Sequence, residues 1–316
     1  MGSSINQNIK GGTIGLLSGV LWGIDTVIIG LSLAMSPLKD LVITAPFISA
    51  FLHDAFSAFW LLIYIILSGN AKKVFREVKL SGSFLVAFAA LLGGPVGMSG
   101  YVLSVKYLGS SYSSAISSMY PAVGAFFAYI FLKDKLKPLG FLGLGMAIGS
   151  TVIIGLTAGG EVLNLGFGIL FALMCVVGWG LESVVISVGM KHEVTPLSAI
   201  LIRQLVSSLI YGFIVMPFIR GYESISLIFQ NPNALIIILT ASLGGILSYT
   251  FYYMAIDLIG PTRAMGLNIS YSAWTIIFGV FFGTPLSVKT LILAIIIIVG
   301  SIFTQDDPMS VFNFKR

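Results

Sequence analysis

Two short segments place a tryptophan three residues before a carboxylate inside otherwise apolar stretches of the chain. The segment "VLWGID" holds Trp22 and Asp25, and "VGWGLE" holds Trp179 and Glu182. Residues three apart share one face of a helix, so each pair offers an aromatic ring beside a negative charge. Because the face of an aromatic ring attracts cations, both segments are candidates for one side of a cation-binding site.

Three further ionisable residues interrupt apolar stretches: His53, Asp54 and Arg203. A charge at the centre of a membrane span costs roughly 2.5–3.5 kcal/mol, so each one indicates a polar cavity or a partner. Asp54 and Arg203 occupy related places in their segments and are expected to neutralise each other, which leaves Asp25 and Glu182 as surplus negative charge. We interpret these five residues as a network for proton coupling or substrate attraction. For Glu182 and His53 a hydrogen bond between packed helices is the alternative, and the adjacent His53 and Asp54 are expected to point in different directions.

Aromatic residues gather in the same apolar stretches, although membrane interfaces would place them at the ends of spans. Besides the two tryptophans they are Tyr101, Tyr120, Tyr252, Tyr271 and Trp274. Several rings around one cation form the cage that binds quaternary ammonium groups. Packing is the alternative for each ring taken singly. A cage with surplus negative charge favours an organic cation over a phosphate ester, which would require several buried Arg or Lys residues.

The elements that position these residues are predicted to be membrane-spanning helices. The 316-residue chain is 57% hydrophobic and 9% charged, outside the range of ordinary soluble proteins. A span needs about 20 apolar residues. Polar and Gly/Pro breaks predict an all-α polytopic protein with ten spans, the first retained rather than cleaved: 13–34, 41–67, 82–106, 111–132, 138–157, 164–189, 197–219, 234–258, 262–283 and 287–304.

The positively charged residues predict the orientation of these spans, because loops rich in Lys and Arg stay in the cytoplasm. With the N-terminus inside, the inner segments hold most of them, including Lys10, the cluster at 72–79, the cluster at 133–137, Arg263 and 315–316. The outer segments hold only Lys39, Lys106, Arg220 and Lys289. Both termini are therefore predicted to be cytoplasmic. The charge of +5 is explained by this bias and requires no nucleic-acid partner.

The third and fourth spans match the eighth and ninth without a gap. Gly93, Gly94, Tyr101, Gly109 and Tyr120 fall on Gly244, Gly245, Tyr252, Gly260 and Tyr271. Trp22 in span one likewise matches Trp179 in span six. Five spans per half is an odd number, so the second half is expected to run through the membrane in the opposite sense. Inverted repeats are typical of secondary transporters. We therefore predict a first repeat over 1–160, a second over 161–305 and a cytoplasmic tail over 306–316; duplication without transport is the alternative.

Glycines and a proline are predicted to shape the helices. Spacing of four residues at Gly15, Gly19 and Gly23, at Gly93 and Gly97, and at Gly145 and Gly149 indicates close helix packing. Pro95 is expected to bend the third span, since proline lacks a backbone donor.

Signatures of soluble enzymes are missing from the chain. It contains no GxSxG, P-loop or HExxH motif, and its two histidines and one cysteine provide no convincing metal site. We predict no enzyme activity, no metal and no cofactor. Any concentrative transport must then use an ion or substrate gradient.

The segments "LWGID", "FLHDAFS", "GWGLESVV", "LIRQLVSS" and "GLNISYSAWT" resemble EamA-type permeases of the drug/metabolite transporter superfamily, and most closely its bacterial choline-uptake permeases. The resemblance covers nearly the whole chain and implies choline import through an aromatic pocket in the bacterial inner membrane, coupled to proton entry. Export of amino acids, metabolites or cationic drugs is the alternative.

The resemblance also implies roles for single residues. Trp22 and Trp179 would form cage walls. Further contacts would come from Tyr252, Tyr271 and Trp274, with Asn268 as a polar contact and Glu182 as the anionic partner. Asp25 departs from the family pattern, in which an uncharged residue is expected. A second carboxylate puts strict choline specificity and the number of coupled protons in question.

Overall fold

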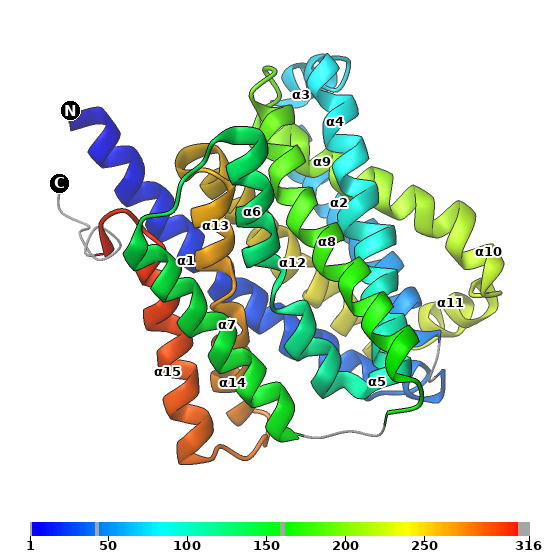
Figure 1. Cartoon of the computed structure of the whole chain (residues 1–316). Coiled ribbons are helices and arrows are strands. Elements are labelled where there is room, and N and C mark those ends of the chain that lie inside the picture. The colour runs from blue at the N-terminus through cyan, green and yellow to red at the C-terminus, as the bar shows by residue number, and fades with distance from the viewer. Residues whose placement is uncertain (1, 42–43, 159–161, 309–316) are drawn as a thin grey trace.

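The computed structural model describes residues 2–41, 44–158 and 162–308, and every regular element in them is helical (Figure 1). The first half contains α1 (Gly2–Leu33), η1 (Leu38–Asp40), α2 (Ala45–Leu67), α3 (Ala71–Glu77), α4 (Ser81–Leu91), η2 (Leu92–Met98), α5 (Ser99–Ser117), α6 (Tyr120–Leu132) and α7 (Pro138–Ala158). The second half contains α8 (Leu165–Met190), α9 (Pro196–Ile210), η3 (Tyr211–Val215), α10 (Met216–Phe218), α11 (Tyr222–Phe229), α12 (Pro232–Ile259), α13 (Pro261–Asn268), α14 (Tyr271–Val280) and α15 (Val288–Phe303).

Eight helical segments in the described part are long and apolar enough to cross a membrane, and Val288–Phe303 is a shorter apolar helix. These nine segments coincide with nine of the predicted spans to within a few residues, apart from the start of the first. The predicted span 262–283 forms two short helices, α13 and α14, which meet at residues 269–270. The chain is therefore a multi-pass helical membrane protein. Most of the predicted tail, including Lys315 and Arg316, and the predicted repeat boundary at 160–161 lie outside the described residues.

Local sequence explains where several helices begin. The side chains of Asn164 and Asn231 accept hydrogen bonds from the backbone N–H groups of Phe167 and Ala234, and so cap α8 and α12. Ser287 caps α15 in the same way. Such caps satisfy backbone donors that have no partner within the helix. Each cap fixes the residue at which its helix starts, and therefore the position of the central residues along the helix axis.

The third span changes its helix type around Pro95, where a bend was predicted. Residues Leu92–Met98 form the wide π-helical turn η2 between α4 and α5, with Pro95 inside it. Proline cannot donate the usual backbone hydrogen bond, and the wide turn accommodates that loss. The turn presses its backbone against α8, the helix that carries Trp179 and Glu182.

The matched segments of the two halves also share backbone features. Gly109 breaks α5 with φ 80° and ψ 162°, and Gly260, its counterpart, separates α12 from α13 with φ 82° and ψ 162°. A positive φ of this kind is readily available only to glycine. On the same gapless match, the start of α6 at Tyr120 corresponds to the start of α14 at Tyr271.

The glycine predictions are confirmed in one helix and wrong in another. A Cβ at Gly15, Gly19 or Gly23 of α1 would run into side chains of α13 and α14 or the turn between them. Around Gly145 and Gly149 of α7 no other atom lies within 4 Å of an added Cβ. Four-residue spacing thus indicates close approach only where another helix packs on that face.

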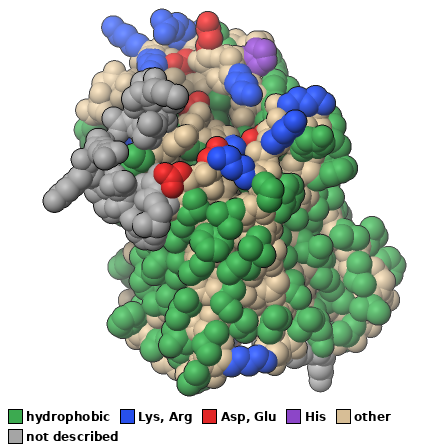
Figure 2. All heavy atoms as spheres, turned by 60° about the vertical axis from the view of Figure 1, so that its left-hand side comes forward, with side chains coloured by type: hydrophobic (Ala, Val, Ile, Leu, Met, Phe, Trp, Pro, Cys, Tyr) green, Lys and Arg blue, Asp and Glu red, His purple; other side chains and the backbone are tan. Residues whose placement is uncertain are grey.

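Charged side chains gather at one end of the molecule. Figure 2 shows Lys, Arg, Asp and Glu side chains at the upper end of one face and a broad hydrophobic area below them. At this end Arg263 pairs with Asp134 and Asp306 at 3.0 and 3.1 Å, joining the connection after α6 to the start of α13 and the end of α15. The charged end is the one predicted to face the cytoplasm.

A carboxylate also joins two helices at this end. Glu77 of α3 accepts hydrogen bonds from the backbone N–H and hydroxyl of Thr195 at 3.0 and 2.6 Å, and from the hydroxyl of Ser198 at 2.7 Å. These groups belong to the first turn of α9 and the residue before it. Glu77 therefore anchors α3 to the beginning of α9.

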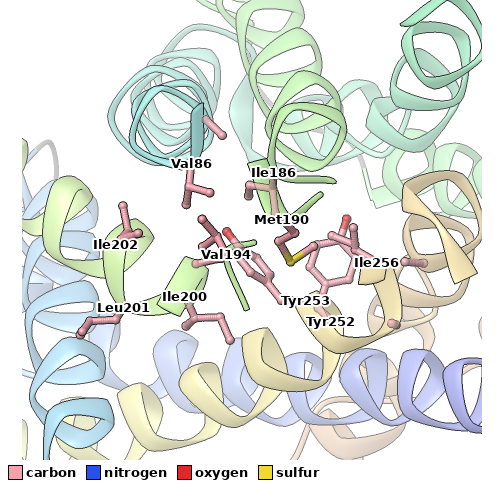
Figure 3. Packing of buried hydrophobic residues seen from close by; sticks show 14 of the residues in the cluster. Val86, Ile186, Met190, Val194, Ile200, Leu201, Ile202, Tyr252, Tyr253 and Ile256 are labelled. Atoms are coloured by element: carbon pink, nitrogen blue, oxygen red, sulfur yellow. The ribbon is translucent and has the colours of Figure 1, made fainter. Parts of the chain in front are cut away.

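A hydrophobic core fills the space between α4, α8, α9 and α12. Val86, Ile186, Ile200, Tyr253 and Ile256 are all buried there and point toward one another (Figure 3). This packing holds together the helices α8 and α9, which carry Glu182 and Arg203.

Candidate functional site

Arg203 of α9 bridges two carboxylates in the middle of the bundle. Its Nη1 lies 2.9 Å from Asp54 Oδ1 of α2, and its Nε lies 3.2 Å from Glu182 Oε1 of α8. The predicted Asp54–Arg203 pair is confirmed. The expectation that Glu182 would be unpaired is wrong, because the forked guanidinium has five N–H donors and reaches both acids at once.

His53 of α2 lies between Asp54 and a third carboxylate, Asp25. Its Nε2 is 3.3 Å from Asp25 Oδ2 of α1, and its Nδ1 is 3.5 Å from Asp54 Oδ1. The expectation that the adjacent His53 and Asp54 point apart is wrong, since the imidazole turns back toward its neighbour. Asp25 is likewise not isolated. The five ionisable residues predicted as a network therefore form one continuous chain.

The network is deeply buried. The exposed fractions are 3% for Asp25, 7% for His53, 6% for Asp54, 8% for Glu182 and 4% for Arg203. Three carboxylates face one arginine, so ionised acids leave a surplus of negative charge whether or not His53 is protonated. Charges at this depth are screened little, and the surplus attracts a cation strongly.

Glycines make room for the network. A Cβ on Gly93, in the π-helical turn, would overlap the carboxylate of Glu182, and one on Gly245 of α12 would overlap the imidazole of His53. These are close approaches that only glycine permits. We predicted packing alone for Gly93, and the repeated "LGG" of the matched segments was the signal that could have located both residues.

The predicted aromatic residues largely meet beside the network. Trp22 stacks on Tyr271 with ring centroids 4.5 Å apart and lies 6.5 Å from Trp179. Tyr101 and Tyr120 contact Trp179 at 5.7 and 5.8 Å. We call these five residues the ring cluster. It joins α1, α5, α6, α8 and α14, so helices of both halves contribute to it.

Tyr249 of α12 was not singled out from the sequence and connects the ring cluster to the network. Its hydroxyl accepts a hydrogen bond from Arg203 Nη2 at 2.9 Å, and its ring lies 4.5 Å from the guanidinium. The same ring is 6.3 Å from Trp22. The repeat match gave no signal, because the counterpart of Tyr249 is Met98, which is not aromatic.

The remaining predicted contacts lie at the edge of the cluster. Tyr252 shares a 2.7 Å hydrogen bond with Ser183 of α8. Asn268 accepts from Tyr120 at 3.1 Å and donates to Ser18 at 3.0 Å, which fixes its amide beside the rings. Trp274 stacks on Phe278. No contact between the Trp274 ring and the ring cluster occurs among the described residues.

Two cavities lie on either side of the Tyr252–Ser183 hydrogen bond. A cavity of about 10 Å³ is lined by Trp22, Asp25, Tyr249, Tyr252 and Asn268 together with two small residues of α12. A second cavity, of about 330 Å³, opens toward the charged end. Ser187 and Ile256, one turn beyond the bonded pair, line this second cavity. The hydrogen bond therefore lies between the residues that line the small cavity and those that line the cavity at the charged end. In the part of the chain that the structure describes, no His, Cys, Asp and Glu side chains form a metal site.

A multi-pass helical bundle with a buried charge network and rings at its centre is typical of membrane transporters. The chain belongs to the EamA-like transporter family, whose pattern matches residues 9–156 and again residues 166–305. This confirms the family resemblance seen in the sequence, and members of the family are not enzymes.

Similar proteins support the same assignment. The chain is 32% identical to Protein LicB of Haemophilus influenzae over 298 residues, covering 94% of this chain and 97% of that protein. The chain also matches the crystal structure of another protein with a TM-score of 0.71 at 17% identity. The match covers 93% of this chain and 94% of the other one. This second likeness concerns the fold alone.

Proposed function

We propose that this transporter imports choline or a closely related quaternary amine, by alternating access and with proton coupling. The ring cluster beside the surplus negative charge is the observation that carries the proposal. A quaternary ammonium group cannot donate hydrogen bonds, so aromatic faces and a fixed negative charge are the means of binding it. The sequence resemblance to choline-uptake permeases supports the same substrate.

In this proposal Trp22, Trp179 and Tyr271 surround the cation and Glu182 supplies the nearby charge. Further contacts come from Tyr101, Tyr120, Tyr252, Asn268 and the newly found Tyr249. Trp274 is left outside the cage because its ring packs on Phe278 instead.

Alternating access is proposed to come from two inverted repeats of five spans each. The two separate family matches and the equal backbone conformation at Gly109 and Gly260 support a duplication. The gathering of charge at one end supports termini that face the cytoplasm of a bacterial inner membrane.

Substrate entry requires the rings to separate. They contact one another closely, and the cavity of about 10 Å³ between the ring cluster and α12 has room for roughly one water molecule. Binding of an organic cation is therefore coupled to movement of the helices that carry the rings. A site that changes shape around its ligand is what alternating access needs.

The test is uptake of radiolabelled choline into proteoliposomes with an imposed inward proton gradient. We expect the wild-type protein to accumulate choline above empty liposomes, and Glu182→Gln and Trp179→Ala to reduce that uptake strongly. Choline should also raise the unfolding midpoint of the wild-type protein more than that of either variant. If the wild type accumulates no choline but extrudes another amine or metabolite, it is an exporter and the proposal is wrong.

A further inference from the structure

Each half of the protein contributes one tryptophan–carboxylate pair and one basic residue that contacts the carboxylate. Asp25 of α1 contacts His53 of α2, and a Cβ on Gly245 of α12 would meet both. Its counterpart Glu182 of α8 contacts Arg203 of α9, and a Cβ on Gly93, one residue before the counterpart of Gly245, would meet its carboxylate. We call these the histidine half-site and the arginine half-site. The tryptophan three residues before each carboxylate completes the equivalence.

The two half-sites differ in one chemical property. Arginine keeps its charge at every pH that a protein experiences, whereas histidine gains and loses a proton near neutrality. The histidine half-site is also incompletely bonded. Asp25 Oδ1 and His53 Nε2 are buried and make no hydrogen bond, although the latter lies 3.3 Å from Asp25 Oδ2. Asp25 also lines the small cavity, which has about the volume of one water.

We propose that the histidine half-site binds the coupling proton between Asp25 and His53, while the arginine half-site keeps a constant charge beside the organic cation. This inference rests on the proposed function and assigns its proton site. It also gives a role to Asp25, the residue that departs from the family pattern.

Charge balance explains why both ligands are needed. The groups that face one another are three carboxylates, one guanidinium, the His53 imidazole and the Tyr249 hydroxyl, contributed by α1, α2, α8, α9 and α12. With His53 neutral, three negative charges face one positive charge. One proton on His53 and one monovalent organic cation then bring the site to neutrality. A site with a net charge is costly to move through a membrane, so the fully loaded form moves most readily.

The geometry also favours joint transport over exchange. A proton and a cation that competed for one carboxylate would displace each other. Here Asp25 and Glu182 are separate carboxylates on different helices, and the chain of ionisable side chains between them in the described residues runs through His53, Asp54 and Arg203. Asp54 contacts His53 at 3.5 Å and Arg203 at 2.9 Å, so the two half-sites sense each other electrostatically through this one shared acid, while the proton and the organic cation are assigned to different carboxylates.

The experiment compares two activities in proteoliposomes: accumulation of choline driven by a pH gradient, and exchange of labelled for unlabelled choline without a gradient. For Asp25→Asn, whose choline-loaded site is neutral without a proton, we expect accumulation to fall to the level seen without a gradient while exchange continues. For His53→Gln, whose choline-loaded site keeps one negative charge, we expect the same loss of accumulation together with slower exchange. His192→Gln, which changes an exposed histidine outside the network, should match the wild type in both assays. Gradient-driven accumulation by His53→Gln at the wild-type level would overturn the inference. Loss of both choline exchange and choline-induced thermal stabilisation in the two variants would also overturn it.

A second measurement on the wild-type protein covers the case in which both variants fail to fold. With the membrane potential held at zero, one coupled proton predicts a tenfold choline ratio at balance for each unit of pH difference. A ratio that does not change with the pH difference contradicts proton coupling and hence the inference. Absence of both exchange and accumulation in the wild type would instead contradict the proposed choline transport itself.

Discussion

Gly93→Ala should weaken choline binding without removing any polar group. Gly93 lies in the π-helical turn that presses on α8, and an added Cβ would overlap the carboxylate of Glu182. The carboxylate is held by Arg203 at 3.2 Å, so moving it stretches a buried ion pair. Overpacking a tight interior site costs about 1–3 kcal/mol. If that cost falls on the bound state, affinity drops by about 5- to 140-fold, since 1.4 kcal/mol is a factor of ten.

The assay is a choline titration that follows the unfolding midpoint of purified protein, with uptake measured in parallel. Gly145→Ala is the matched control, because a Cβ at that membrane-helix glycine meets no atom within 4 Å. We expect this control to bind choline like the wild type. A Gly93→Ala protein with wild-type affinity and wild-type uptake would refute the idea that this glycine positions the Glu182 carboxylate.

Two further predictions concern the ring cluster and the charged end. Trp22→Ala should weaken choline binding by about 2- to 30-fold, because a cation–π contact contributes about 0.5–2 kcal/mol. Trp274→Ala should change the affinity less than about twofold. Equal losses of affinity in the two variants, measured by choline titration, would contradict the cage. Burial alone would raise the pKa of Glu77, but hydrogen bonds from Thr195 and Ser198 hold that pKa below its usual range. A lowered pKa stabilises the folded protein above the carboxyl's ordinary pKa, and this is lost as pH falls through the lowered value. Glu77→Gln should therefore lower the unfolding midpoint at neutral pH, with a difference that shrinks in acid; a difference that stays constant with pH would contradict this account.

The spans could be predicted closely because apolar length and Gly/Pro breaks are local signals. The break within the ninth predicted span was missed, since residues 262–283 read as one apolar stretch. The composition of the charge network was also visible, because ionisable residues in apolar runs are conspicuous. The pairing of these residues could not be predicted from the sequence. Whether Arg203 meets one acid or two depends on how α2, α8 and α9 are rotated about their axes, and tertiary packing sets that rotation.

The ring cluster shows the same division. Trp22 and Trp179 were found through their spacing from a carboxylate, and both lie in the cluster. Tyr249 escaped notice because neither its spacing nor its repeat counterpart marks it. Trp274 illustrates the converse case, because a favourable sequence context does not decide which face of a short helix the ring occupies. One-dimensional spacing fixes neighbours within a helix but not between helices.

The Tyr252–Ser183 hydrogen bond between the two cavities has a consequence for the energy landscape of the cycle. It joins two neutral hydroxyls, and such a bond contributes about 0.5–1.5 kcal/mol net. This bond alone would therefore favour the closed arrangement by about 2- to 13-fold. A carrier whose alternative forms are nearly equal in free energy can be redirected by ligands that prefer one form only modestly. Under the proposed alternating access, this bond by itself therefore adds little to the closed form, and the ring contacts and the bound ligands must set most of the balance between the two forms.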